Sequence, residues 1–573
     1  MWGRVVDTNG LLTIIALVLA VYAILPKERQ RELVLRFRTF DLLLAVTGLV
    51  ITHALQYYSF LRKILPLGEW KDTEFAAYSL SEQSLSYLII LLVSLILILR
   101  MSRFRLRPSG LAAFKNLVDA EIGGKDFSSL ATVVEDHIKA LVDISRGRFF
   151  RSNFHRLLGP PSFFDSIENR KRLNVPRQLR WIVDFVPSGK AAESLASQIL
   201  TTILSNKPFA VWCSENRPYV ALSILKLEAS IGGPFIENFF QAQLGDSSSV
   251  LYSELKNNQN MARGHRYQFP ESNRILSQVL GDPAEAERVQ IWRPIGEKMI
   301  AYLSELGKHP EQDDYNLPLE DYMDNQRYES PLSAGIFFFD LMVSEAIHKG
   351  IKWHMWLYYM THVTDRICDN YSPRSEKIDL TREFPTKYSF VLYEITRALR
   401  SWISTLEELP VVQQNINLAS TAADHENGNP IKSSMIALGQ HIHSVITCAR
   451  IPIRFKNDLA EQAFSQYVEL NKMQNGGRYA EAFLAILLVG GTYEHENDAP
   501  YLGALIAAAI DWDDVLFNEN GARELLKSLV SEFQRRYDRE RLRDYVDFEN
   551  TANGIRILRD GGGKIDIEIV AAQ

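Results

Sequence analysis

The sequence predicts a mainly α-helical protein with three parts: an N-terminal three-helix transmembrane anchor, a large α-helical cytoplasmic body with a small α/β element, and a C-terminal β-hairpin. Three observations predict this fold. Three apolar stretches lie within the first 107 of the 573 residues. From residue 283 onward, apolar residues recur every three or four positions, which is typical of amphipathic helices. Near the C-terminus, a glycine-rich turn separates two short apolar segments, which is typical of a hairpin.

The three apolar stretches are Leu11–Leu25, Phe40–Phe60 and Ser84–Leu99. About 20 apolar residues are needed to cross a hydrocarbon core of ~30 Å. A bilayer leaves no backbone polar group free to bind water, so a spanning segment of this kind must be helical. The sequence therefore predicts transmembrane helices over about residues 10–26, 40–60 and 84–101.

The charges beside these stretches predict their orientation. The first loop, Lys27–Thr39, carries five Lys or Arg residues, and the second, Leu61–Gln83, carries three beside four acids. Four further arginines lie within residues 100–107. Because Lys and Arg are retained on the cytoplasmic side, we expect an integral membrane protein with its N-terminus outside and its large C-terminal part in the cytoplasm. A bacterial inner membrane is the expected location.

Charge and cysteine content limit the function classes. Residues 1–107 contain 13 Lys and Arg against 8 Asp and Glu, and the rest of the chain contains 50 against 61. An acidic body argues against general nucleic-acid binding, which needs a basic face. Cys213, Cys368 and Cys448 are far apart, without C-x-x-C spacing. This predicts a reduced compartment with no disulfide framework or zinc ribbon, and no cofactor is expected.

Four regions follow from these patterns. They are the anchor (1–107), juxtamembrane helices with a basic segment (108–180), a possible small α/β region (181–282) and an α-helical domain ending in a hairpin (283–573). The second region has helical spacing over Leu111–Ile122 and Leu130–Ile144, divided by two glycines. The third region has two candidate strands, Trp181–Val186 and Phe209–Cys213, on either side of a helix at Ser188–Asn206. A polar loop is expected over Asp246–Glu271.

The last region is predicted to be almost entirely helical. Its expected helices are Pro283–Lys308, Leu332–Asn370, Tyr388–Leu409, Ile431–Ile451, Asn457–Met473, Tyr479–Leu488, Tyr501–Ile510 and Ala522–Tyr537. The expected hairpin strands are Ile555–Leu558 and Ile565–Val570.

The segment Arg146–Arg180 combines bases with interleaved phenylalanines. Its candidate surface-binding residues are Arg146, Arg148, Arg151, Arg156, Arg170, Lys171, Arg172 and Arg177. Such a segment could bind single-stranded nucleic acid by stacking and charge neutralisation. Close to a membrane helix, however, each base favours anionic lipid head groups by ~1 kcal/mol. The bilayer and its anionic head groups are therefore the expected partners, and nucleic acid is not.

A further hypothesis concerns Arg148 and His155, which are seven residues apart and so share one helix face. This Arg-x(4–6)-His spacing resembles that of the all-helical HEPN ribonucleases. The polar residue usual after the arginine in that family is Phe149 here. The resemblance implies a catalytic role for Arg148 and His155, in a chain otherwise rich in arginine.

A second group of polar residues forms a stripe along one predicted helix. It consists of His354, Tyr358, His362, Asp365 and Asp369, spaced by three or four residues. The two histidines lie about 12 Å apart along the helix and cannot share one metal ion. His362 with Asp365, or Asp365 with Asp369, could bind a metal if other ligands joined them, and His362 with Asp365 could act as an acid–base pair. The surrounding aromatic residues favour a packed core, and both interpretations stay open.

These observations predict a membrane-tethered sensor, scaffold or effector that acts by binding, with perturbation of the membrane by oligomerised helices as one mode of action. A homo-oligomer or a complex with a partner protein is expected. One alternative is a membrane-tethered hydrolase or HEPN-like ribonuclease that uses Arg148 and His155, or His362 and Asp365. Another is a subunit of an oligomeric channel or transporter, because three helices per chain must oligomerise to enclose a path.

Overall fold

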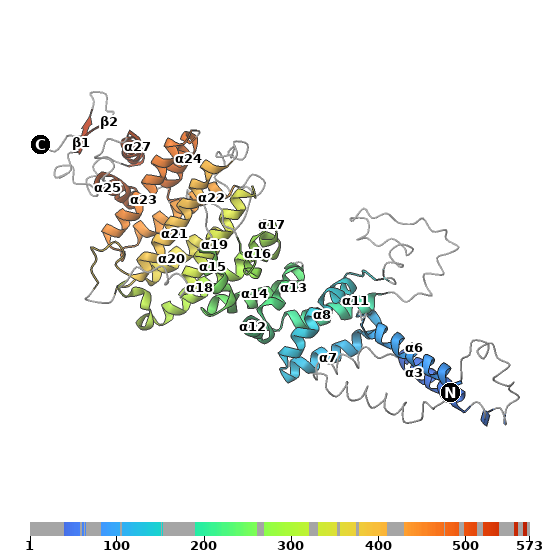
Figure 1. Cartoon of the computed structure of the whole chain (residues 1–573). Coiled ribbons are helices and arrows are strands. Elements are labelled where there is room, and N and C mark those ends of the chain that lie inside the picture. Colours follow the sequence, from blue (N-terminus) through green and yellow to red (C-terminus); the bar gives the residue numbers. More distant parts are fainter. Residues whose placement is uncertain are drawn as a thin grey trace. The chain divides into compact units, whose positions relative to one another are not determined.

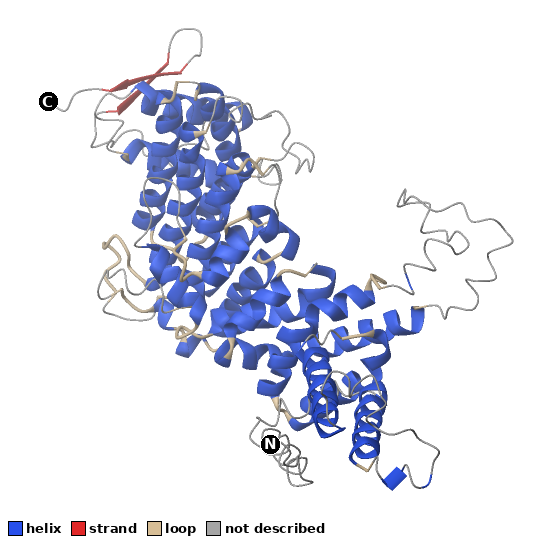
Figure 2. Cartoon of the chain, turned by 45° about the vertical axis from the view of Figure 1, so that its right-hand side comes forward, coloured by secondary structure: helices blue, strands red, loops and turns tan. Residues whose placement is uncertain are grey.

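The computed structural model describes residues 39–57, 60–61, 64, 82–102, 106–149, 152, 189–227, 229–259, 269–319, 330–351, 356–373, 378–409, 429–474, 476–491, 498–512, 520–537, 555–559 and 565–569. Nearly all of them belong to helices or to the turns between helices (Figure 2). The chain divides into two compact units, Met1–Ile203 and Leu204–Gln573.

In the first unit, helices α3 (Thr39–Gln56) and α6 (Glu82–Ser102) pack against each other along their length (Figure 1). Small residues allow the close approach, since a Cβ added at Gly48 would lie 3.0 Å from Val93. Ser86 donates a hydrogen bond to the carbonyl oxygen of Thr52 at 3.4 Å. These pairs show that the helices are antiparallel. Several large apolar side chains of the pair are exposed, among them Leu43, Val46, Val50, Leu88, Leu91 and Leu92.

The predicted membrane anchor is wrong. Among the described residues, no helix has both the length and the apolar content needed to cross a membrane. At 1.5 Å per residue, the 18 residues of α3 extend only ~27 Å and include Asp41 and His53. The apolar part of α6, Tyr87–Leu99, extends ~20 Å between polar ends. The expected transmembrane topology and inner-membrane location depended on this anchor and are not supported either. The first apolar stretch, Leu11–Leu25, lies outside the described residues.

Two further helices of this unit, α7 (Leu111–Gly124) and α8 (Phe127–Ser145), have the positions that their apolar spacing predicts. Lys125 ends α7 in a left-handed conformation with φ 55°. Asp126 then begins α8, because its carboxylate accepts a hydrogen bond from the Ser129 amide at 3.2 Å. Helix α11 (Lys190–Leu204) corresponds to the helix expected over residues 188–206.

The second unit is a multi-helix assembly. Its helices are α12 (Lys207–Asn216), η5 (Pro218–Val220), α13 (Ala221–Leu225), α14 (Ala229–Gly245), α15 (Val250–Gln259), α16 (Arg274–Leu280), α17 (Pro283–Val289), α18 (Trp292–Lys308), η6 (Pro310–Gln312), η7 (Asp314–Asn316), α19 (Pro331–His348), α20 (Tyr358–Asn370), α21 (Lys387–Ser404), η9 (Thr405–Glu408), α22 (Pro430–Thr447), α23 (Ile453–Lys472), α24 (Gly477–Leu488), α25 (Ala499–Asp511) and α27 (Asn520–Arg536).

Helix α19 lies at the centre of this unit (Figure 1). It contacts α14, α15, α16, α17, α18, α21 and α22. A helix that is apolar on every side must be covered on every side. Phe338, Phe339 and Leu341 are accordingly fully buried. The apolar run Phe337–Ile347 thus forms the central part of a buried core helix.

The small α/β element is not found among the described residues of 181–282, which contain only helices and turns. Of the two expected strands, Phe209–Cys213 lies inside α12, and Trp181–Val186 lies outside the described residues. Asn206 begins this helix by accepting from the Phe209 amide at 2.9 Å, and Pro208 lies in its first turn. Phe209, Ala210 and Cys213 form its buried face. The predicted polar loop at 246–271 likewise contains α15.

Glu254 of α15 takes over the capping of a neighbouring helix. Its two carboxylate oxygens accept from the amides of Ile275 at 3.1 Å and Leu276 at 2.8 Å, at the start of α16. Asn273 precedes α16 but does not cap it, because its side-chain amide donates to the Glu254 carbonyl at 2.8 Å. Burial raises the pKa of Glu254, while these backbone donors lower it.

Glu254→Ala is therefore expected to lower the free energy of unfolding by about 3 kcal/mol, since it leaves two buried amides without an acceptor. Urea unfolding of the full chain measures this loss. Lys256→Ala, on the exposed face of the same helix, is the control and should change stability by no more than about 0.5 kcal/mol. Equal effects of the two variants would contradict the capping role.

At the C-terminal end, β1 (Ile555–Arg559) pairs antiparallel with β2 (Ile565–Ile569), with Ile557 opposite Ile567. The residues between the two strands, which would form the turn, lie outside the described residues. The complete β-hairpin that the sequence predicts is thus not seen.

Candidate functional site

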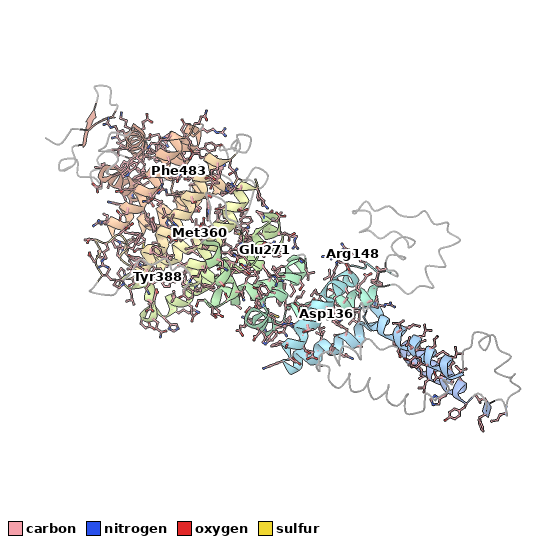
Figure 3. All side chains as sticks on the ribbon, viewed as in Figure 1. Asp136, Arg148, Glu271, Met360, Tyr388 and Phe483 are labelled. Atoms are coloured by element: carbon pink, nitrogen blue, oxygen red, sulfur yellow. The ribbon has the colours of Figure 1, made fainter. Side chains whose placement is uncertain are left out.

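Helices α20 and α22 lie side by side and run parallel. Thr364 contacts His441, Asp365 contacts Ser444 and Cys368 contacts the Ser444 carbonyl, so residue numbers rise together along both helices. The buried side of α20 is apolar and includes Met360, labelled in Figure 3. The opposite side borders a groove, and this groove is the candidate site.

The polar stripe of the sequence lies on the exposed side of α20. Tyr358, His362, Asp365 and Asp369 are all exposed, and His354 lies outside the described residues. The interpretation of the stripe as packed core is therefore wrong. The aromatic and apolar residues that suggested a core face other directions: Trp356, for example, is fully buried just before the helix begins.

The groove has a volume of about 660 Å³, within the range of small-molecule sites. Helix α20 contributes the exposed stripe, and α22 with the turn after it contributes the other wall. The residues that line it are Tyr358, Thr361, His362, Asp365, Cys368, Asp369, Gln440, His443, Ser444, Thr447, Cys448, Ala449 and Arg450. Carboxylates, imidazoles, hydroxyls, thiols and a guanidinium thus border one open space.

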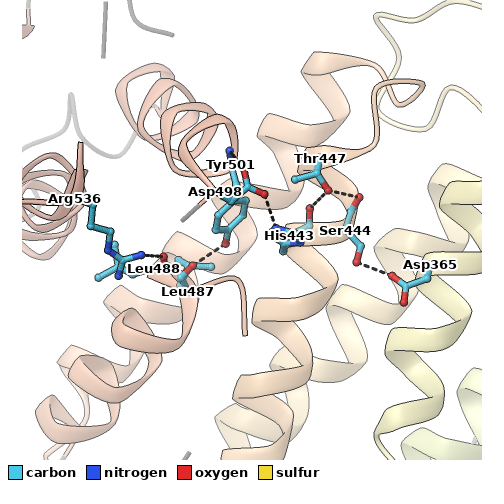
Figure 4. Close-up of polar contacts among 9 residues, drawn as sticks. All are labelled: Asp365, His443, Ser444, Thr447, Leu487, Leu488, Asp498, Tyr501 and Arg536. Carbon is cyan, nitrogen blue, oxygen red and sulfur yellow. Dashed lines mark hydrogen bonds and ion pairs between the residues drawn. The ribbon is translucent and has the colours of Figure 1, made fainter. Parts of the chain in front are cut away.

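The metal-site hypothesis is not supported. Within the part of the chain that the structure describes, no group of three or more His, Cys, Asp and Glu side chains is arranged to hold a metal ion. Asp365 accepts instead from the Ser444 hydroxyl at 2.7 Å, and Asp369 lies 3.7 Å from Arg366 (Figure 4 shows the first contact). His362 and Asp365 remain as two polar groups of the groove wall.

The fully buried His441 of α22 joins the two helices of the groove to α21. Nδ1 of His441 lies 2.6 Å from the hydroxyl of Thr364 in α20, and Nε2 lies 2.9 Å from the hydroxyl of Thr396 in α21. Burial lowers the pKa of His441 to about 3, so the ring is neutral near pH 7. A neutral ring has one donor and one acceptor nitrogen, so it donates to one threonine and accepts from the other.

His443 points away from His441, as expected for positions two apart on a helix. Its Nε2 lies 3.0 Å from the Asp498 carboxylate, and its ring packs on Tyr501 at 4.7 Å between centroids (Figure 4). Asp498 also begins α25 by accepting from the Tyr501 amide at 3.0 Å. His443 of the groove wall therefore contacts the start of α25 through Asp498.

Both cysteines of the groove lie where α20 and α22 end. The Cys368 sulfur lies 3.6 Å from the Ser444 carbonyl oxygen, and the Cys448 sulfur lies 3.6 Å from the Cys368 carbonyl oxygen. Arg450 also donates to the Cys368 carbonyl, at 2.7 Å. A hydrogen bond from Cys368, two backbone amides and the Arg450 guanidinium lower the pKa of Cys448 to about 6, although burial opposes this.

A second pocket adjoins the groove and has an aromatic lining. It has a volume of about 420 Å³ and is lined by Trp292, Glu297, Ile300, Tyr358, Tyr359, His362 and Arg366. Tyr358 and His362 border both spaces. The rings of Trp292 and Tyr359 lie 6.1 Å apart, and the Tyr359 hydroxyl donates to Glu297 at 3.3 Å. Burial, followed by the charge of Glu297, raises the pKa of Tyr359 to about 12.

The other predicted site residues are not brought together here. Arg146 and Arg148 belong to the first unit, and Arg148 lies 3.7 Å from Asp143. His155 and the bases expected to bind lipid, Arg151, Arg156, Arg170, Lys171, Arg172 and Arg177, lie outside the described residues. The HEPN-like site and the lipid-binding surface therefore stay predictions.

Sequence reasoning missed Cys368, Cys448 and Arg450 as site residues. The two cysteines are 80 positions apart, and only the parallel packing of α20 and α22 brings them together. A weak signal was present, because each cysteine lies near the end of a predicted helix. Comparisons with protein-family models, with curated proteins and with solved structures find no match, so the function of this chain is argued from the groove itself.

Proposed function

We propose that this chain acts by binding, as a sensor or effector, and that the groove with its aromatic pocket binds a small molecule that has a flat ring and hydrogen-bond donors. The observation that carries the proposal is that Tyr358 and His362 line both spaces, so that the groove and the aromatic pocket are immediate neighbours.

The aromatic pocket favours a ring. Trp292, Tyr358 and Tyr359 present three aromatic side chains around one space. Tyr358 is 48% exposed, which leaves much of its side chain open to a ligand. Contacts between aromatic rings contribute about 0.5–1.5 kcal/mol beyond the apolar area that they bury.

The groove favours hydrogen-bond donors on the same ligand. Asp365 and Asp369 are exposed acceptors on the wall formed by α20, and Asp365 uses one oxygen for Ser444. Arg450 stands on the opposite wall as a donor. A ligand that bears amino or hydroxyl groups beside its ring could satisfy these side chains from the aromatic pocket, as nucleosides and aromatic amines do.

Binding is measured by the shift of the unfolding temperature of the full chain with nucleosides, nucleotides and aromatic amines, against simple sugars. A ring compound at 100 times its Kd adds about 2.7 kcal/mol to stability. Tyr358→Ala and Asp369→Asn are expected to reduce or abolish the shift. Tyr219→Ala, at an exposed tyrosine that does not line either space, is the matched control and should keep it.

Two outcomes would contradict the proposal: no ring compound shifts the transition, or the shift is equal in Tyr358→Ala and in Tyr219→Ala. The homo-oligomer or partner protein that the sequence suggests stays a prediction, which sedimentation of the full chain can test.

A further inference from the structure

Two of the three cysteines of the chain meet at one end of the groove. Cys368 lies in the last turn of α20, and Cys448 directly follows α22. Each sulfur lies 3.6 Å from a backbone carbonyl oxygen close to the other cysteine. Neither is part of a disulfide, and Cys448 is partly exposed whereas Cys368 is 8% exposed. The pair therefore has one thiol open to a reagent and one thiol behind it.

The surroundings of Cys448 stabilise a thiolate. The hydrogen bond from Cys368 contributes most to the lowered pKa of Cys448, and the backbone amides of Arg450 and Ile451 and the charge of the Arg450 guanidinium add to it. The pKa of Cys448 therefore lies below that of an ordinary cysteine, so a larger fraction of its side chain is thiolate at pH 7. The thiolate, not the thiol, is the nucleophile.

Cys368 has the opposite tendency. The neighbouring Cys448 sulfur and burial both raise its pKa, so it keeps its proton. Its single S–H can donate to the Ser444 carbonyl or to the Cys448 sulfur. The pair thus combines an ionised, partly exposed sulfur with a protonated, nearly buried one, an arrangement suited to two successive steps.

We propose that Cys448 reduces hydroperoxides in this groove and that Cys368 converts the product into a Cys368–Cys448 disulfide. The inference goes beyond the proposed function, since a reactive thiol pair and a ring-binding pocket can each exist without the other. The substrate class is a hydroperoxide, ROOH, which is the oxidant.

In the first step, the Cys448 thiolate attacks the terminal oxygen of the hydroperoxide. A sulfur–oxygen bond forms, the oxygen–oxygen bond breaks, and the leaving alkoxide takes a proton to become the alcohol, or water if the substrate is hydrogen peroxide. Cys448 becomes a sulfenic acid, the reversible first product of thiolate oxidation. Arg450 is placed to stabilise negative charge on the oxygen that leaves.

In the second step, Cys368 loses its proton and attacks the Cys448 sulfur. A sulfur–sulfur bond forms, the sulfur–oxygen bond breaks, and the hydroxyl leaves as water after it gains that proton. Overall, two thiols lose two electrons, and one hydroperoxide becomes one alcohol and one water. The disulfide joins the end of α20 to the turn after α22 and so alters the wall of the groove.

The test uses the full-length, reduced chain with one equivalent of hydrogen peroxide, followed by thiol titration and peptide mapping without reductant. We expect the wild type to lose two thiols and to yield a peptide pair that joins Cys368 to Cys448. Cys448→Ser should lower the rate at which the chain loses thiols to hydrogen peroxide at least tenfold. Cys368→Ser should accumulate a sulfenic acid at Cys448 that dimedone traps. Cys213→Ser, at a fully buried cysteine, is the matched control and should react as the wild type does.

The pH profile gives a second readout that a purely structural role would not change. The wild-type rate of thiol oxidation should be half-maximal clearly below about pH 8.5, the pKa of a free cysteine, because the surroundings of Cys448 lower its pKa. Each serine variant is compared at equal folded fraction, measured by circular dichroism. The proposal is overturned if Cys448 reacts no faster than a free cysteine, or if half-maximal reaction lies near pH 8.5. It is equally overturned if dimedone labels the wild type as strongly as Cys368→Ser.

Discussion

Replacing His441 by alanine is expected to lower the free energy of unfolding by about 3 kcal/mol, among the largest effects of any single substitution in the second unit. The side chain is fully buried and joins the hydroxyls of Thr364 and Thr396. Its loss leaves a cavity and removes two buried hydrogen bonds, each worth about 1 kcal/mol. Urea unfolding of the full chain at pH 7 measures the change.

His362→Ala is the matched control, because His362 is exposed on the groove wall. It should change stability by no more than about 0.5 kcal/mol. A large loss of stability in His362→Ala would restore the core interpretation of the stripe and contradict the groove. Near-equal stability of His441→Ala and the wild type would contradict the clamp between α20, α21 and α22.

The same residue predicts a pH dependence. Its pKa is about 3 in the folded chain and near 6.5 in the unfolded chain. Below pH 6.5 the imidazole takes up a proton in the unfolded chain but not in the folded chain. The contribution of His441 to the free energy of unfolding is therefore complete above that pH and is lost as the pH falls toward 3. Between pH 7 and pH 5 this amounts to about 2 kcal/mol. The difference in stability between wild type and His441→Ala should narrow by that amount over this interval.

Trp402→Ala is expected to have a comparably large effect, about 4 kcal/mol. The indole is fully buried in α21 and its Nε1 donates to Asp340 of α19 at 2.8 Å. The substitution removes packing against the central helix and takes one donor from a carboxylate. Thermal and urea unfolding both measure the loss.

Trp402→Phe separates the loss of packing from the loss of the hydrogen bond, because phenylalanine keeps most of the packing but cannot donate. It should lower the free energy of unfolding by about 1–3 kcal/mol. Arg397→Ala, at a half-exposed position on the same helix, is the control. If Trp402→Phe costs as much as Trp402→Ala, the hydrogen bond and not the packing dominates at this position.

Much of the helical second unit could be predicted from apolar spacing. Tyr388–Leu409, Ile431–Ile451 and Ala522–Tyr537 correspond closely to α21, α22 and α27. Two of the predicted helices, Pro283–Lys308 and Leu332–Asn370, were too long, because the chain breaks inside each of them. One break is at Gln290, which ends α17 with φ 52°, and another is at Gly350, which has φ 68° after α19. A left-handed glutamine is not readable from spacing, since the preference belongs to glycine and asparagine.

The membrane anchor was predicted wrongly because a run of apolar residues does not by itself give a spanning helix. In α3 the run is interrupted by polar residues and in α6 it ends early. Gly48 and Thr52 instead place α3 close against α6.

The candidate site was only half predictable. Helical spacing placed His362, Asp365 and Asp369 on one face of a helix, but which face is exposed depends on the packing of α18, α21 and α22 around it. Cys448 and Arg450 join that face only through the tertiary contact between α20 and α22. The spacing of residues along one helix does not indicate which distant residues will complete such a face.

The central claim is that ligands of this protein occupy the groove between α20 and α22, and the most direct test is the alkylation rate of Cys448. Iodoacetamide labels the reduced full-length chain with and without a ring compound that raises its unfolding temperature, and mass spectrometry follows Cys448 and the buried Cys213 separately. The account predicts that a saturating compound slows labelling of Cys448 at least tenfold and that Tyr358→Ala removes this protection. A compound that stabilises the chain yet leaves the rate at Cys448 unchanged would contradict it.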